Sequence, residues 1–280
     1  MTLVTILLGL AAAAAYGSGD FLGGLATRRA AIFSVVVPVQ AVGLAALAVA
    51  LPFLHGTLSP GAVTYGVLGG ITGGAGIALL YRALAVGKMG VVSPITAVLA
   101  AALPVVAGTM RGEHLTVLQM AGMATALAAV VLISLTADDD GKIEITTEGV
   151  KEAFASGVLL SGFYIFLAFA PKDAGPYPLL FARFASLVLL AGVALIMRQS
   201  IVPPRGVRSL TAAGGVLDMG ANGLYVAAAQ SGFVSIAAVL TSLYPAATVL
   251  LAFAFLRERL RLWQNAGLVL ALAGVAMISL

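Results

Sequence analysis

Hydrophobic residues along this chain form long continuous stretches, separated by short breaks that carry charge, proline or glycine. The stretches do not alternate apolar and polar positions, so they indicate helices rather than half-buried strands. Each is about long enough to cross a bilayer, which takes about 20 residues in a helix. The breaks divide the chain into ten predicted spans, near residues 3–26, 31–53, 61–86, 90–110, 115–136, 152–170, 176–197, 207–230, 233–255 and 261–280.

The composition agrees with a membrane protein. Hydrophobic residues make up 61% of the 280 residues, only 9% are charged, and the mean hydropathy is +1.10. A water-soluble domain could not cover its surface with so few charges, whereas lipid favours an apolar exterior and requires backbone polar groups to be paired internally. We therefore predict an all-α integral membrane protein. With no cysteine and two histidines, the chain is expected to hold no metal centre, and no cofactor is expected.

The second half of the chain repeats part of the first. Residues 69–135 align without a gap on residues 214–280, an offset of 145, and 21 of the 67 aligned positions are identical. Such a fixed-period match indicates an internal repeat. It carries the third to fifth spans onto the eighth to tenth, so the unit has five spans, and an odd number inverts the second copy in the membrane. We predict two inverted five-helix repeats, 1–136 and 152–280, joined by an acidic linker at 137–151. The match of the first two spans of each half follows only from this count.

Lysine and arginine are distributed unevenly over the connecting segments. Most follow odd-numbered spans, and the positive-inside rule then places those connections in the cytoplasm and both termini outside. The residues after odd-numbered spans are Arg28, Arg29, Lys88, Lys142, Lys151, Arg198, Arg205, Arg208, Arg257, Arg259 and Arg261, and those after even-numbered spans are Arg111 and Lys172.

Short motifs in both halves resemble a known family. In the second half they are Ala228, Gly232, Thr241-Ser242-Leu243-Tyr244-Pro245, Arg257-Glu258-Arg259, Gln264-Asn265-Ala266-Gly267 and Gly274-Val275, and in the first half Leu80-Tyr81-Arg82-Ala83-Leu84, Gly87, Glu113, Gln119 and Gly122. With these residues the chain resembles the drug/metabolite transporter superfamily, in particular its EamA-like exporters. One departure is Ala100, which stands opposite Pro245 in the repeat.

The resemblance implies a ten-helix carrier of two inverted repeats, in a plasma membrane of bacterial type. It would export amino acids or other small metabolites through a cavity lined mainly by the first, third, fourth, sixth, eighth and ninth helices. For many members it also implies cytoplasmic termini, which conflicts with the charge distribution. The expected partners are a small-molecule substrate and the lipid bilayer, with protons as candidate coupling ions. The basic run at residues 257–261 is too short to indicate nucleic-acid binding.

Ionisable side chains inside apolar spans are the sharpest candidates for a site, because a charge there costs roughly 3 kcal/mol or more and usually faces a partner or a wet cavity. Tyr16 and Asp20 are four residues apart and share one face of the first span. Asp218, Asn222 and Tyr225 form one polar stripe on the eighth span. We expect the two acids to bind a substrate ammonium group or a coupling proton. Alternatively, Asp20 pairs with Arg28 or Arg29, and the stripe only links neighbouring helices by hydrogen bonds.

The remaining candidates are polar and aromatic residues of other spans. Arg82 could hold a carboxylate, or could extend to the cytoplasmic surface. Thr96 and Thr241 match in the repeat and are predicted to line the pocket symmetrically, or else only to pack at kinked helices. Tyr81, Tyr164, Tyr225 and Tyr244 are expected to contact the apolar part of the substrate. Arg183 is interpreted as structural, paired with Asp173, and Glu113 and Glu258 as structural ion-pair partners of nearby arginines.

These residues favour a secondary transporter of amino acids or similar small amphipathic metabolites. An exporter of organic cations is the main alternative, since two intramembrane acids and aromatic rings also suit a cation. A membrane receptor or assembly subunit that does not transport is a third hypothesis. An intramembrane enzyme is not favoured, because candidate nucleophiles such as Ser161 have no histidine or lysine base within the spans.

Overall fold

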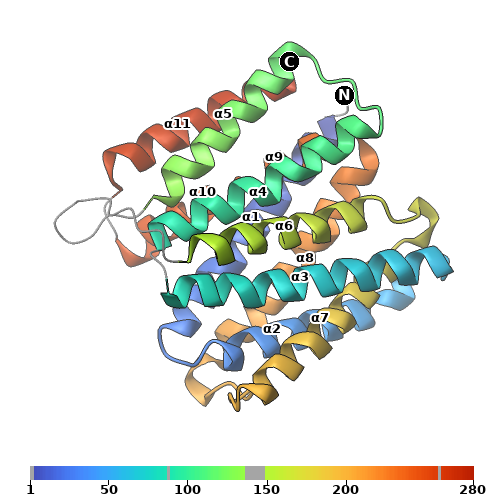
Figure 1. Cartoon of the computed structure of the whole chain (residues 1–280), viewed down its shortest axis with the longest axis vertical. Helices are drawn as coiled ribbons and strands as arrows, with labels where there is room; N and C mark the ends of the chain where they lie inside the picture. Colours follow the sequence, from blue (N-terminus) through green and yellow to red (C-terminus); the bar gives the residue numbers. More distant parts are fainter. Residues whose placement is uncertain (1–2, 87–88, 136–148, 258–259) are drawn as a thin grey trace.

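The computed structural model describes residues 3–86, 89–135, 149–257 and 260–280, and over these ranges the chain is helical, with no β-strand (Figure 1). The predicted all-α fold class is confirmed. The helices are α1 (Leu3–Thr27), α2 (Phe33–Ala50), α3 (Pro60–Val86), α4 (Met89–Met110), α5 (Val117–Ser134), α6 (Val150–Ala168), α7 (Tyr177–Ile196), α8 (Arg208–Ser231), α9 (Val234–Thr241), α10 (Tyr244–Leu256) and α11 (Leu262–Ser279). Most of the predicted linker lies outside the described residues.

Eight helical stretches of the described chain are long and apolar enough, by length and composition, to cross a membrane. One of them, Val234–Leu256, comprises α9 and α10 together. The two predicted spans outside this set are α4, whose described apolar part is Ile95–Met110, and α8, which carries Asp218, Asn222 and Gln230 among its apolar residues. The two ends of the chain lie close to the same end of the helix bundle (Figure 1).

Helices from the two halves of the chain pack against each other in matching pairs. The pairs are α1 with α8 and α6 with α3, α2 with α8 and α7 with α3, α10 with α1 and α4 with α6, and α5 with α11. In the repeat, α1 corresponds to α6, α2 to α7, α3 to α8, α4 to α9 and α10, and α5 to α11. When each helix is replaced by its counterpart, the α1–α8 contact becomes the α6–α3 contact, and the other pairs exchange in the same way. The α5–α11 contact becomes itself. The two halves therefore use the same helix contacts.

Glycines at the α5–α11 contact show this correspondence at single residues. A Cβ atom on Gly122 would lie 2.9 Å from the Gly274 carbonyl oxygen and 2.9 Å from the Ile278 nitrogen. A Cβ atom on Gly267 would lie 3.1 Å from the Ala129 carbonyl oxygen and 3.1 Å from the Ile133 nitrogen. Each contact becomes the other when 145 is added to or subtracted from the residue numbers. Only glycine lets the two backbones approach this closely.

A second pair of glycine contacts shows which residues of α2 and α7 correspond in the two halves. The sequences of these two helices have no recognisable identity from which to align them. Gly70 of α3 packs against the carbonyl oxygen of Ala182 in α7, and Gly215 of α8 packs against the carbonyl oxygen of Val39 in α2. The two glycines differ by 145 in number, but their partners differ by 143. The second span of each half therefore corresponds with an offset of 143.

The predicted span at residues 233–255 corresponds to the apolar stretch Val234–Leu256, but it consists of two helices, because α9 ends at Thr241 and α10 begins at Tyr244. Pro245 lies in the first turn of α10. A proline has no backbone N–H and cannot continue a helix without losing a hydrogen bond. In the first half Ala100 occupies the matching position, and α4 runs without a break from Met89 to Met110.

Glu113 joins the two halves as a helix cap rather than as the predicted ion-pair partner. Its Oε1 accepts a hydrogen bond from the Val234 backbone N–H at 2.6 Å, and its Oε2 accepts from the Ser235 backbone N–H at 3.1 Å. A carboxylate at this end also stabilises the helix dipole of α9. The neighbouring Arg111 lies over the Phe169 ring, 3.9 Å from its centroid. Glu258, the repeat counterpart of Glu113, lies outside the described residues.

A matched pair of glycine substitutions tests the α5–α11 contact. Gly122→Ala places a Cβ against the α11 backbone, and overpacking of this kind costs about 1–3 kcal/mol, so we expect a lower melting temperature of the purified protein. Gly24→Ala is the control, because a Cβ there meets no atom within 4 Å. Equal melting temperatures for the two variants would contradict the close contact.

Candidate functional site

An ion pair between Arg183 and Asp218 lies at the centre of the candidate site. Arg183 comes from α7 and Asp218 from α8, and Arg183 Nη2 bonds to Asp218 Oδ2. The arginine side chain is 8% exposed and the aspartate side chain 29% exposed, so the pair is largely withdrawn from solvent. The predicted partner of Arg183, Asp173, is wrong, because Asp173 instead accepts a hydrogen bond from Thr57 Oγ1 at 2.8 Å.

The arginine reaches α8 past α2. Gly43 of α2 lies beside it, since a Cβ there would lie at ordinary contact distance, 3.6 Å, from Arg183 Nε, and at a tighter 3.2 Å from the Gly215 carbonyl oxygen. Arg183 Nε also donates to Met219 Sδ at 3.4 Å. The backbone of α7 is tied to α2 through Ser186, whose Oγ accepts from Gln40 Nε2 at 3.2 Å. These contacts hold the guanidinium in one place.

Asp20 and Asn222 complete a polar group that we call the acid cluster, defined as Asp20, Arg183, Asp218 and Asn222. Asn222 Nδ2 donates to the Asp218 carbonyl oxygen at 2.5 Å and lies 3.5 Å from Asp218 Oδ2. Asp20 is close enough to Asp218 for the two carboxyl groups to interact electrostatically. Asp20 is exposed, although it lies seven residues before the end of α1. The predicted pairing of Asp20 with Arg28 or Arg29 does not appear among the ion pairs of the described chain.

Four tyrosines from four helices gather beside the acid cluster. Their rings form a chain of contacts, in which the Tyr16 centroid is 6.4 Å from those of Tyr164 and Tyr244, and the Tyr164 centroid is 4.7 Å from that of Tyr225. The Tyr225 hydroxyl donates to the Tyr164 carbonyl oxygen at 2.9 Å and so joins α8 to α6. We call Tyr16, Tyr164, Tyr225 and Tyr244 the tyrosine cluster. The sequence predicted all four as site residues, and the structure brings them together.

The other predicted site residues lie elsewhere. Arg82 is 72% exposed near the end of α3, and its Nε lies 3.8 Å from Glu152 Oε1. Thr96 is buried and donates to the Ala153 carbonyl oxygen at 3.2 Å, which ties α4 to α6. Thr241 is 1% exposed at the end of α9, and its Oγ1 finds no hydrogen-bond partner in the part of the chain that the structure describes. The side chain of Tyr81 lies outside the described residues.

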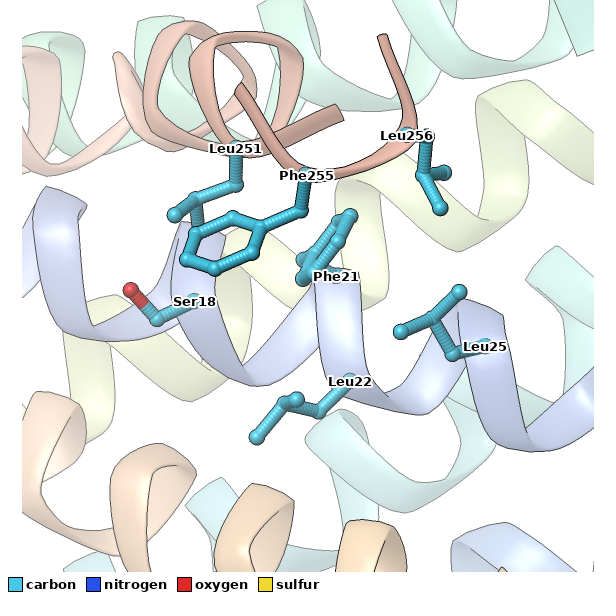
Figure 2. A pocket seen from close by; sticks show the side chains of 7 residues that line it. All are labelled: Ser18, Phe21, Leu22, Leu25, Leu251, Phe255 and Leu256. Atoms are coloured by element: carbon cyan, nitrogen blue, oxygen red, sulfur yellow. The ribbon is translucent and has the colours of Figure 1, made fainter. Parts of the chain in front are cut away.

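Two clefts open on the described chain, and neither is lined by a residue of the acid cluster or the tyrosine cluster. The first, of about 360 Å³, lies between α1 and α10, next to Asp20 in sequence (Figure 2). Its walls are apolar apart from one serine, and the Phe21 and Phe255 rings approach each other in it with centroids 6.2 Å apart. The second, of about 550 Å³, lies between α2, α7 and α8 and reaches Met219, the contact of Arg183. Residues of the first cleft are Ser18, Phe21, Leu22, Leu25, Leu251, Phe255 and Leu256.

The acid cluster has no counterpart in the other half of the chain. In the repeat, Gly73 matches Asp218 with the offset of 145, and Phe163 matches Asp20 with the offset of 143 that relates α2 to α7. The α1–α8 and α6–α3 contacts support that second match, since Gly19 packs on Leu217 and Gly162 on Thr72. A Cβ on Gly73 would lie 2.9 Å from the Phe163 ring. The α1–α8 contact carries the two acids, whereas the Phe163 ring fills the equivalent α6–α3 contact.

Arg183 and Gln40 are the residues of the site that sequence reasoning missed. Both are buried polar side chains, and the described structure offers Gln40 Oε1 no hydrogen-bond donor. The signal for Arg183 was present, because a charge inside an apolar span requires a partner of opposite charge. Asp218 was the acid at a similar depth in another span, whereas Asp173 lies in a connection between helices.

Comparisons with known proteins agree with the fold. Residues 148–280 match the model of the EamA-like transporter family. A solved structure titled only as the crystal structure of a protein is similar over 99% of this chain and 98% of its own, with a TM-score of 0.82 and 20% sequence identity. At this identity the likeness shows a common fold alone. The comparison with curated proteins finds no match.

Breaking the ion pair from one side should destabilise the protein more than breaking it from both sides. Arg183→Met leaves the Asp218 carboxylate without its cation, and loss of one partner of a buried pair costs about 3–5 kcal/mol. Adding Asp218→Asn to Arg183→Met should restore part of that loss. Thermal unfolding of the purified variants in detergent measures both effects, and a double variant less stable than Arg183→Met would show that the pair is not coupled.

Proposed function

We propose that this chain, which belongs to the EamA-like transporter family, is a secondary transporter that exports amino acids or similarly small amphipathic metabolites by alternating access. Family membership and the apolar helices make it an integral membrane protein. The observation that carries the proposal is the meeting of charged and aromatic side chains from both halves of the chain at the acid and tyrosine clusters. Polar groups within membrane spans are costly and mark substrate or ion pathways.

The proposed architecture is ten spanning helices in two inverted repeats, 1–136 and 152–280, with a linker at 137–151. The exchange of helix pairs and of glycine contacts between the halves supports it. The position of both chain ends at one end of the bundle supports an even number of crossings (Figure 1). In carriers of this kind the substrate site lies where the repeats meet, near the middle of the bilayer.

The site residues divide by chemistry. Asp20 and Asp218, with Asn222, would engage an ammonium group, and the tyrosine cluster would contact the apolar part of the substrate. Thr96, Thr241, Tyr81 and Arg82 stay predictions. The exposed side chain of Arg82, next to Glu152, supports a place at the end of α3 rather than at the centre of the path.

Alternating access would move one half against the other around this site. We propose that an ion gradient, with the proton as the candidate ion, or the gradient of the substrate itself supplies the energy. The clustering of lysine and arginine in the connections after odd-numbered spans supports a plasma membrane orientation with both termini outside. Labelling of residues near the two termini by a membrane-impermeant reagent, added to one side of the membrane only, would test this orientation.

Counterflow into proteoliposomes tests the transport function. Vesicles that contain the purified protein and are preloaded with an unlabelled amino acid or amine should take up the labelled compound faster than empty vesicles. Asp20→Asn should abolish most of this uptake because it removes the exposed carboxylate, whereas Asp173→Asn, at a connection between helices, should not change it. No uptake above empty vesicles for any compound in an amino acid and amine panel would overturn the proposal.

A further inference from the structure

The charges of the acid cluster do not cancel. Asp20 and Asp218 carry two negative charges, and Arg183 carries one positive charge, so the cluster has a net charge of −1 when its carboxyl groups are ionised. Every other lysine or arginine of the described chain lies in a connection or within four residues of a helix end. These residues are Arg28, Arg29, Arg82, Arg111, Lys151, Lys172, Arg198, Arg205, Arg208, Arg257 and Arg261.

The uncompensated charge belongs to Asp20. Asp218 is already neutralised by Arg183, whose Nε and Nη2 are both engaged. A carboxylate within a span is costly until a cation or water reaches it. Asp20 is not covered by other side chains of the described chain, and the hydroxyls of Tyr164 and Tyr244 lie within its electrostatic reach.

A buried acceptor beside the acids also lacks a donor. Asn222 is 2% exposed, and its Oδ1 has no hydrogen-bond partner among the residues that the structure describes. The nitrogen of the same amide contacts Asp218, so the free oxygen lies at the acid cluster. An unmet buried acceptor is unfavourable unless a ligand or water donates to it. An N–H donor with positive charge satisfies both Asn222 and Asp20.

We propose that the contact between α1 and α8 binds an organic cation of net charge +1, a primary amine on an apolar body, in preference to a zwitterion. The inference rests on the proposed transporter and narrows its substrates to the amines among small amphipathic metabolites, away from zwitterionic amino acids. The ammonium group lies at Asp20 and Asn222, and the apolar body lies against the tyrosine cluster, whose ring faces attract cations. A carboxylate on the ligand finds no free described cation here, because Arg183 is held by Asp218.

The chain has one such site, because the equivalent contact of the other half is closed. Phe163 stands where the repeat places Asp20, and its ring packs on Gly73. The site is therefore off the symmetry axis, and we expect one ligand per chain.

Three ligands with the same ring and different charge test the proposal: 2-phenylethylamine (+1), phenylalanine (0) and 3-phenylpropionate (−1). Binding to the purified full chain is measured by calorimetry, together with the rise in melting temperature that a ligand of the folded state causes. We expect the amine to bind with one ligand per chain and at least about tenfold more tightly than the other two, since a charge-assisted hydrogen bond is worth about tenfold or more in affinity.

Substitutions at the acids change the charge sum. Asp20→Asn leaves the Arg183–Asp218 pair intact, so we expect an unchanged melting temperature and a loss of amine affinity of about tenfold or more. Asp218→Asn with Asp20 retained brings the sum to zero and should shift the preference toward phenylalanine. Asp173→Asn is the control and should bind the amine like the unmodified chain.

Tighter binding of phenylalanine than of the amine by the unmodified chain, or an unchanged amine affinity in Asp20→Asn, would overturn the inference. Those results would leave the transporter proposal standing if phenylalanine shows counterflow. Amine binding at Asp20 without counterflow of any compound would instead overturn the transporter proposal and leave the binding site in place.

Discussion

Close approach of helix backbones at glycine is the constraint on which the rest of the structure depends. Apolar side chains gain little by leaving lipid for another helix, so helices in a bilayer associate through tight packing and polar contacts. Gly122 and Gly267 bring α5 and α11 together. Gly43 and Gly215 bring α2 onto α8, beside the Arg183 side chain that reaches Asp218. The ion pair of the site therefore lies next to a close glycine contact between α2 and α8.

Much of the fold could be predicted from the sequence, because one physical requirement decides it. A chain in lipid must pair its backbone groups within helices, and the breaks between apolar stretches place the helix ends to within a few residues. The break between α9 and α10 was not predicted, because a proline in a span can either kink a helix or end it. The criterion of length and apolarity also does not include α8, whose polar stripe belongs to the candidate site.

The site was predictable in part for a similar reason. Polar residues in apolar helices stand out, so Asp20, Asp218 and the four tyrosines were found from their types and spacing. The partner of Arg183 was not, since it depends on which helices are neighbours, and α7 reaches α8 only past α2. The correspondence of Asp20 with Phe163 was also hidden, because the first two spans of each half have no recognisable identity and their offset differs by two residues from that of the others.

Matching positions of the two halves hold Ala100 and Pro245, and this difference has an energetic consequence for a protein with two related halves. If both halves were identical, exchanging their conformations would produce two states of equal free energy, and the empty protein would populate each equally. A continuous α4 and an interrupted α9–α10 pair respond differently to bending. In the alternating-access transporter that we propose, the two states would then differ in free energy. The unloaded protein would have a preferred resting side, and its ligand would have to bind with enough differential affinity to shift that bias.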